Sequence, residues 1–436
     1  MNLLITNAEE VQAYTIVRSL RAFAENIVIT LGGRSVQVDR FAGMALFSRY
    51  VDAHYDVPHF ASGWAAGRLS TFNTSAEESY VQRIQEICDL ERIDTIIPSL
   101  DPEVYLFSKN KDRFEQRGIT VVVPEPEIVH RLIDKALTLQ AAEKVGFPVP
   151  VTHHPKSIAD VEKVIDNFRP PWVVKSRIGA HLSGVHYVTN DDELRKVYAE
   201  SARRQPDPLI QQYIPGVERC HYYITVDRSH EILSLLQPNP MYVFTDGVGT
   251  SIKSAVSDTE GPLLPQLREL VRELRLWGSF TVQTKVDPAD GIPRLLEINP
   301  RFGHHLWFRT ELGVNEPLIC LRLARREDPQ SNLEYPIGVA MLDPYHDLFY
   351  FLESLIRRPD QGPEKSPQSP RELLSLHRRQ YLNRRKKVFC PQFSHFFSDP
   401  WPCIRAYAFK FNSRLLRPAL SALRKRLWRA ETQPGT

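Results

Sequence analysis

The first 125 residues alternate between two hydrophobic periods. Short, continuously apolar runs have the length of buried strands, and they stand at 3–6, 27–31, 95–98 and 120–124. Between them, stretches such as 11–24 and 80–88 carry apolar residues at helical spacing. Short buried strands that alternate with amphipathic helices are typical of βαβ units. The pattern therefore predicts an N-terminal domain that is built on a parallel sheet.

The middle of the chain has a different pattern. From about 150 to 325, aromatic and β-branched runs are separated by Gly, Pro and Asp turns, which favours antiparallel strands. A helix-rich stretch and a stiff connector at 146–150 precede this region, and the segment 355–371 has the Pro, Ser, Gln and Lys content of a flexible linker. These changes predict four parts, which are residues 1–125, 126–205, 206–350 and 351–436.

Composition narrows the class of protein. The chain has 436 residues, of which 25% are charged and 42% hydrophobic, so disordered, collagen-like and disulfide-stapled classes are excluded. No apolar run approaches the ~18 residues of a spanning helix, and the first residues lack the basic region and apolar core of a secretory signal. The five cysteines are scattered and odd in number, which favours a reducing compartment. A cytoplasmic location is expected.

Charge is unevenly distributed along the chain. Residues 351–436 hold 18 Lys and Arg against 6 Asp and Glu, so the remainder carries a net charge of −9 although the whole chain has +3. Apolar residues recur there at three- to four-residue steps among the basic ones, namely Ile404, Ala408, Phe411, Leu415, Ala419, Leu423 and Leu427. Such a basic amphipathic extension suits the anionic inner face of a membrane. Docking on the acidic body of the chain is equally favoured, and nucleic acid is the least favoured partner.

A lysine at the end of an apolar strand is the first candidate for chemistry. Lys175 closes the run 172–175, and a loop that contains Gly179 and Gly184 follows. Glycines let backbone N–H groups turn toward an anion, and lysine supplies a compact charge that suits a phosphate oxygen. An exposed lysine beside a hairpin turn is the alternative. The pair Asp134-Lys135 at a helix start would by itself be read as a solvated surface.

A second candidate is the end of the strand at 209–212. Gln212, Tyr213 and Ile214 lead into a Pro-Gly turn, and Glu218 follows. Such a hinge can offer backbone groups to a purine edge, while the acid accepts hydrogen bonds from ribose hydroxyls. An ordinary β-turn is the alternative.

A hairpin on an Asp-Gly turn holds the third candidate. Glu297 and Asn299 are two residues apart and therefore share one face of a strand, and Gln283 can lie opposite them on the partner strand. One carboxylate and two amide oxygens suit a Mg²⁺ ion that is shared with phosphates. Arg301 can reach the same phosphates as a rigid fork.

Taken in order and spacing, these elements resemble the ATP-grasp superfamily, and in particular its members that are similar to carbamoyl-phosphate synthetase. The element Glu297-Ile298-Asn299-Pro300-Arg301 is the most specific, and Gln283 stands fourteen residues before its glutamate, as in that branch. The resemblance covers roughly residues 1–325. It implies an α/β protein with a Rossmann-like N-terminal domain and two β-rich lobes that clamp ATP. The basic helical extension follows them.

The resemblance also implies roles for individual residues. The residues that would contact ATP are Lys135, Lys175, Gly179, Ser183, Gly184, Val185, Gln212, Tyr213, Ile214 and Glu218. Gln283, Glu297 and Asn299 would hold Mg²⁺, or Mn²⁺ in its place, and Arg301 together with Lys175 would stabilise the transferring phosphoryl group. The loop at 179–184 and the segment 246–251 are candidate lids.

The implied reaction is ADP-forming ligation, in which a small-molecule carboxylate is activated as an acylphosphate and is coupled to an amine or a similar nucleophile. Substrate contacts are expected from His304, His305 and Arg309, with the filling of a domain interface as an equal alternative. A non-catalytic ATP-binding regulator or scaffold, and carboxyphosphate chemistry on bicarbonate, stay open as other functions. Assembly as a homodimer also stays open.

Overall fold

The computed structural model describes residues 1–32, 43–60, 74–179, 184–215, 219–245, 250–258, 263–329, 334–345, 348–349 and 386–412, together with single residues between 371 and 382. The expectations for Ser183, for Glu218, for the lid at 246–249, for most of the linker and for the tail from 413 onward fall outside these residues.

The N-terminal domain contains the predicted parallel sheet. Its strands lie in the order β3-β2-β1-β4-β5, and every pair is parallel. The strands are β1 (Asn2–Ile5), β2 (Asn26–Leu31), β3 (Ala53–Asp56), β4 (Thr95–Ile97) and β5 (Thr120–Val121). Helices pack on it, namely α1 (Val11–Leu20), α3 (Ser75–Glu91), α4 (Asp101–Lys109) and α5 (Lys111–Glu115). Helices on both faces bury the central strands, which explains their continuous apolar runs.

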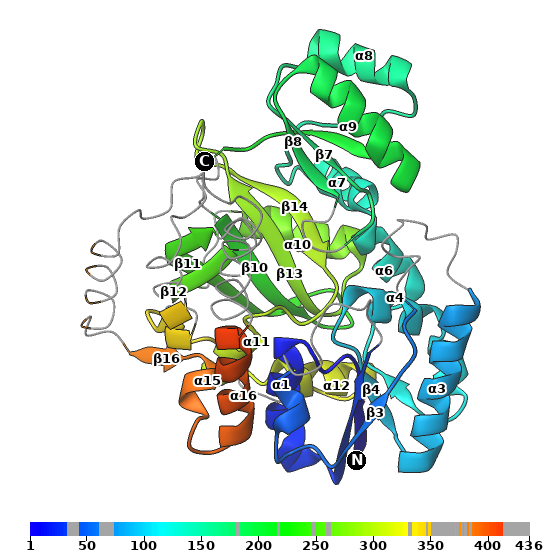
Figure 1. Ribbon diagram of the computed structural model, residues 1–436, viewed down its shortest axis with the longest axis vertical. Coiled ribbons are helices and arrows are strands. Elements are labelled where there is room, and N and C mark those ends of the chain that lie inside the picture. The colour runs from blue at the N-terminus through cyan, green and yellow to red at the C-terminus, as the bar shows by residue number, and fades with distance from the viewer. Residues whose placement is uncertain are drawn as a thin grey trace, which may run out of the picture.

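A small lobe follows the connecting helices α6 (Pro126–Ile133) and α7 (Lys135–Lys144), and it lies apart from the other domains in Figure 1. Its antiparallel sheet has the order β6-β9-β7-β8. The strands are β6 (Thr152–His153), β7 (Trp172–Lys175), β8 (Val185–Val188) and β9 (Leu209–Gln212), and helices α8 (Ile158–Asn167) and α9 (Asp191–Arg204) cover it. The sequence-based boundary at 205/206 is wrong, because β9 lies beyond it and pairs with β6 and β7 of this sheet. The small lobe continues at least to Gln212.

The large lobe is a sheet in the order β14-β13-β10-β11-β12-β15-β16. Its strands are β10 (Arg219–Val226), β11 (Ile232–Thr245), β12 (Thr250–Asp258), β13 (Gly278–Val286), β14 (Pro293–Asn299), β15 (Ala340–Leu342) and β16 (Lys387–Phe389). The helices of this lobe are α10 (Leu264–Leu274), α11 (Leu306–Glu311) and α12 (Glu316–Ala324). All pairings up to β15 are antiparallel, as the alternating pattern predicts, and β16 joins β15 in parallel.

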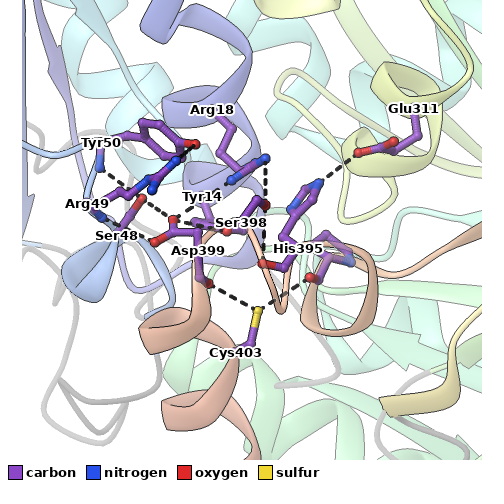
Figure 2. A network of polar contacts seen from close by, with 11 residues as sticks. Tyr14, Arg18, Ser48, Arg49, Tyr50, Glu311, His395, Ser398, Asp399 and Cys403 are labelled. Atoms are coloured by element: carbon purple, nitrogen blue, oxygen red, sulfur yellow. Dashed lines mark hydrogen bonds and ion pairs between the residues drawn. The ribbon is translucent and has the colours of Figure 1, made fainter.

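The described part of the C-terminal extension packs on the body of the protein. After β16, helices α15 (Pro391–Ser394) and α16 (Pro400–Lys410) lie beside α1 of the N-terminal domain. Figure 2 shows that Asp399 is the centre of this contact, where its Oδ2 accepts hydrogen bonds from Ser48 Oγ at 2.6 Å and from Tyr14 Oη at 3.2 Å. Residues 386–412 therefore dock on the body, although the central contact is made by an acid of the extension and not by its basic residues.

Candidate functional site

The centre of the candidate site is the pairing of β13 with β14. Gln283 lies directly opposite Glu297 in the register, and Thr281 lies opposite Asn299. Glu297 and Asn299 share one face of β14, as the two-residue spacing predicts. The structure therefore places the Gln283 amide and the Glu297 carboxylate side by side on neighbouring strands. The Asn299 amide lies two residues further along β14.

Lys135 connects this hairpin to the small lobe. Its Nζ lies 3.5 Å from Glu297 Oε2 and donates a hydrogen bond to the Gly179 carbonyl at 3.0 Å. The position of Lys135 is fixed by its neighbour, because Asp134 caps α7 by accepting from the backbone N–H of Ala136. The same carboxylate pairs with Arg177 in a bidentate contact of 3.0 and 2.5 Å. The acid–base pair at 134–135 is therefore part of a lobe-to-lobe junction and not a solvated surface.

Lys175 lies deep in the junction. Only 6% of the residue is exposed, and burial lowers the pKa of its ammonium group to about 8. The charge of Lys135 lowers this pKa further, whereas the charge of Glu297 raises it. An anionic ligand beside a buried lysine of lowered pKa raises that pKa again, because the negative charge stabilises the ammonium form.

Glu297 is affected in the opposite sense. Burial by itself would raise the pKa of this carboxyl group, but the charges of Lys135, Lys175 and Arg301 outweigh it and hold the pKa below its ordinary value. Glu297 is therefore an ionised acceptor inside a group of cations. Asp101 balances the charge of Arg301, so Lys135 and Lys175 facing the one carboxylate Glu297 leave a surplus of positive charge, which suits a polyanion such as a triphosphate.

The donor set can be tested for its fit to Mg²⁺. Across the residues that the structure describes, no three His, Cys, Asp or Glu gather as a metal cluster. The set proposed from the sequence has one carboxylate and two amides, which is too little for a metal cage made by protein alone. It does fit the usual binding of Mg²⁺ by one or two carboxylates together with phosphate oxygens. Gln283, Glu297 and Asn299 therefore suit a metal that arrives with a nucleotide.

Arg301 contacts the N-terminal domain. Its Nε lies 3.0 Å from Asp101 Oδ2, with 9% and 7% of the two side chains exposed, and its Nη1 donates to the Phe302 carbonyl at 3.2 Å. Burial would lower the pKa of the guanidinium group, but Asp101 and Glu10 raise it. Arg301 thus remains charged at the junction of β14 with the N-terminal domain.

The glycines of the predicted phosphate loop hold its two ends together. Gly184 has a φ of +87°, and a Cβ there would lie 2.4 Å from Ser176 Oγ. The Ser176 N–H donates to the Gly184 carbonyl at 3.2 Å, and Val185 pairs with Lys175 in the β7–β8 register. The residues on both sides of the loop are therefore fixed close to the buried lysine.

The predicted adenine hinge is partly engaged in the protein itself. The N–H of Gln212 donates to the Val151 carbonyl at 2.8 Å, and that of Tyr213 to the Pro171 carbonyl at 3.3 Å, while Ile214 is buried. The Tyr213 ring lies 5.3 Å below the ammonium group of Lys285. An adenine ring that binds at this segment would therefore form hydrogen bonds with its backbone carbonyl groups, or with residues that follow Tyr213.

The predicted substrate residues separate into two groups. His305 Nδ1 lies 2.8 Å from Tyr223 Oη at the start of α11, and His304 is exposed. Arg309 is fully buried in an ion pair with Glu316, also fully buried, so the structure gives this guanidinium an internal partner and not a substrate carboxylate. Such a pair is costly to break because it would leave one buried charge unpaired.

Sequence reasoning missed three residues of the site. Arg177 pairs with Asp134, Asp101 pairs with Arg301, and the ammonium group of Lys285 lies over the ring of Tyr213. Arg177 comes two residues after the lysine that closes the predicted strand. No sequence signal shows which acid pairs with which base when the partners are 43 or 200 residues apart.

Two family models match consecutive parts of the chain. Residues 29–122 match the PylC-like N-terminal domain, and residues 132–304 match the ATP-grasp domain. Among curated proteins, the carbamoyl phosphate synthase large chain of Methanosarcina barkeri is 23% identical over 229 residues, which cover 50% of this chain and 21% of that protein. The chain thus spans about a fifth of the length of the curated relatives it matches.

Solved structures agree on the fold. A biotin carboxylase complex from Campylobacter jejuni has a TM-score of 0.60 at 14% identity, covering 78% of this chain and 74% of that one. An L-amino acid ligase from Bacillus licheniformis has a TM-score of 0.55 at 14% identity, covering 77% and 78%. The predicted fold is confirmed, and residues 132–304 match the ATP-grasp domain directly after the PylC-like N-terminal match at residues 29–122.

Proposed function

We propose that this protein is an ATP- and Mg²⁺-dependent, ADP-forming ligase that couples a small-molecule carboxylate to an amine. The observation that carries the proposal is the contact of Lys135 with Glu297 opposite Gln283, beside the buried Lys175. A cation-rich junction that contains one ionised carboxylate and two amides is suited to a metal-bound triphosphate. The ATP-grasp domain match over residues 132–304 supports the same nucleotide.

In this proposal different residues bind the phosphates, the phosphoryl group in transfer and the metal ion. Lys135 and Lys175 bind phosphate oxygens, and Arg301 lies two residues beyond Asn299, where it can reach the phosphoryl group in transfer. Gln283, Glu297 and Asn299 would hold Mg²⁺, which when bound neutralises phosphate charge. Positioning and charge neutralisation are the main requirements of phosphoryl transfer.

The reaction has two balanced steps. A carboxylate oxygen of the first substrate attacks the γ-phosphorus of ATP, the bond from this phosphorus to the bridging oxygen breaks, and ADP leaves with an acylphosphate formed. The amine then attacks the carbonyl carbon, inorganic phosphate leaves, and the nitrogen releases a proton. The acylphosphate must be kept from water between the steps.

The direct test is ADP release with ATP, Mg²⁺ and pooled carboxylates and amines. Glu297→Gln should reduce the release at least about a hundredfold, because it removes the carboxylate from the metal set. Glu269→Gln is the matched control, since Glu269 is an exposed acid on α10 of the same lobe. Unchanged turnover in Glu297→Gln would contradict the proposal.

The same assay distinguishes the alternative functions. If the protein binds ATP but releases no ADP with any mixture of carboxylates and amines, a non-catalytic regulator is favoured. If bicarbonate alone is sufficient for ADP release, carboxyphosphate chemistry is favoured.

A second proposal concerns the surface of the C-terminal extension, where we infer a contact with an anionic membrane. Aromatic side chains are exposed on and beside α15 and α16, with Phe397 at 95% and Trp401 at 63%. The chain that follows is basic in sequence, with Arg and Lys at 414, 417, 424, 425, 426 and 429. Exposed aromatics beside a basic segment suit the headgroup layer. None of the helices that the structure describes is both long and apolar enough to cross a bilayer.

Vesicle sedimentation tests this surface. The protein should sediment with vesicles that contain phosphatidylglycerol and not with phosphatidylcholine alone, and the double variant Phe397→Ser, Trp401→Ser should lose most of that binding. Leu90→Ser removes a residue that is 67% exposed on α3 and should bind like the unchanged protein. Equal binding by the double variant would contradict the proposal.

A further inference from the structure

The carboxyl edge of the N-terminal sheet holds an excess of hydrogen-bond acceptors. Asn7 follows β1, and Asp101 follows the neighbouring strand β4. Within the described residues, Asn7 Oδ1, Gln12 Oε1 and Asp101 Oδ1 are buried and have no hydrogen-bond partner, and the same holds for one donor, Asn7 Nδ2. The three residues are 1%, 1% and 5% exposed. A buried acceptor without a donor is costly, so three of them at one edge call for an explanation.

Hydrogen bonds place these residues in one neighbourhood. Ser99 Oγ lies 2.9 Å from the Asn7 carbonyl, which it can donate to, and the Ser99 carbonyl accepts from Gln12 Nε2 at 2.8 Å. Asp101 is two residues further along the same segment. The order β3-β2-β1-β4-β5 also makes β1 and β4 the neighbours at which the strand order reverses. Open α/β sheets bind ligands at this point, outside the carboxyl ends of the strands.

The edge adjoins the proposed reaction site. Asp101 uses its Oδ2 to hold Arg301 at 3.0 Å, which leaves Oδ1 without a partner. Glu10 also acts on the charge of Arg301, so two carboxylates, Asp101 and Glu10, act on one guanidinium group here. A ligand at this edge would therefore lie next to the arginine that follows the metal strand.

We propose that Asn7, Gln12 and Asp101 form a site for the ammonium group of the amine substrate. A primary ammonium group has three N–H donors and one positive charge, which match three acceptor oxygens and the one negative charge that Asp101 and Glu10 leave beyond that of Arg301. The site rests on the proposed ligase function for its role, because it identifies the nucleophile as a compound that carries a primary amine. The binding itself can be measured without catalysis.

Binding is tested with a donor-rich probe and a donor-free probe of equal charge. Ethylammonium chloride should raise the midpoint of thermal unfolding above the value in tetramethylammonium chloride at the same concentration. Asn7→Gly should abolish this difference, and glycine tolerates the φ of +50° at this position. Thr15→Val is the control, because it removes a buried hydroxyl without a partner elsewhere on α1. Equal midpoints in the two salts for the unchanged protein would overturn the site.

Kinetics separate this inference from the ligase proposal. With a pair of carboxylate and amine that supports ADP release, Asn7→Gly should raise the KM for the amine about tenfold or more, since one hydrogen bond to a charged group is lost. The KM for ATP should stay unchanged. Asn7→Asp should keep the low KM because it retains the acceptor. Active ligation with an unchanged amine KM in Asn7→Gly would overturn the site and leave the ligase. An ammonium-specific stabilisation without any ligation would support the site and defeat the ligase.

Discussion

Lys135 and Glu297 meet at 3.5 Å although they come from different elements, the first turn of α7 and the strand β14. The contact joins the helix that leads into the small lobe to the hairpin of the large lobe. We expect Lys135→Met to weaken ATP binding about tenfold or more, because a cation at the phosphate site is lost. Isothermal titration with the Mg²⁺–ATP complex would measure it.

The control for that variant lies on the same helix. Lys144→Met removes a lysine that is 68% exposed and paired with Glu273, so it should leave nucleotide affinity unchanged. Equal affinities for the Lys135 and Lys144 variants would argue against a phosphate role for Lys135.

Lys175 predicts a pH dependence of stability. Its pKa in the folded protein is about 8 because of burial, below the ordinary 10.5 of the unfolded chain. Between these values the unfolded chain binds more protons, so the contribution of Lys175 to stability rises as the pH increases from about 8 to 10.5. Lys175→Met removes this titration. Its stability relative to the unchanged protein should therefore be highest below pH 8 and decline through that window in urea unfolding. A constant difference across the window would contradict the assignment.

The affinity for ATP should also depend on the protonation of Lys175, but it should fall as the pH rises, whereas the stability rises. Above about pH 8, Lys175 loses its proton in the free protein, so binding of ATP then requires uptake of a proton. The affinity of the unchanged protein should fall from pH 8 to pH 9.5, whereas that of Lys175→Met should be lower and nearly flat. Titrations in buffers of different ionisation enthalpy would detect the proton uptake.

The buried pair of Arg301 and Asp101 predicts a loss of stability. More than nine-tenths of each side chain is buried, so Asp101→Ala should cost roughly 3–5 kcal/mol of unfolding free energy by leaving an unpaired guanidinium. Glu86→Ala breaks the exposed pair with Arg83 and should cost less than about 1 kcal/mol. Chemical denaturation compares the two, and similar losses would contradict the cross-domain pairing.

Gly184 predicts a steric defect beside the phosphate loop. Gly184→Ala combines a positive φ of +87° with a Cβ placed 2.4 Å from Ser176 Oγ. Gly338→Ala has the positive φ of +78° but nothing within 4 Å, so it isolates the backbone cost of roughly 1–3 kcal/mol. We expect Gly184→Ala to be the more destabilised, with part of the excess recovered by adding Ser176→Ala. Equal unfolding midpoints for the two single variants would exclude the steric contact.

Much of the fold could be predicted from local patterns. The continuous apolar runs at 3–6, 27–31 and 95–98 became central parallel strands, because helices cover both faces of such a sheet. The Asp-Gly turn at 290–291 set the β13–β14 hairpin, and the hairpin register brought Gln283 opposite Glu297. These features depend on neighbours in sequence, and their periods are visible in the residues themselves.

Other expectations required the tertiary structure. The boundary at 205/206 missed β9, since a strand of four residues gives no sign of the sheet it will join. For Arg309, contact with a substrate and the filling of a domain interface are equal expectations from the sequence, and Glu316 holds it in the core. The extension at 386–412 docks on α1 through Asp399, a single acid whose partners are 351 and 385 residues away.

The sequence by itself determined the βαβ and hairpin elements, the set of charged residues and the resemblance to ATP-grasp proteins, because periodicity and motif spacing are local properties. Only the tertiary structure decided which charges meet. Lys135 with Glu297, Arg301 with Asp101, and the acceptors at Asn7, Gln12 and Asp101 are brought together by the packing of separate lobes. Burial then sets their proton affinities and their need for partners, because desolvation acts only once the chain has enclosed them.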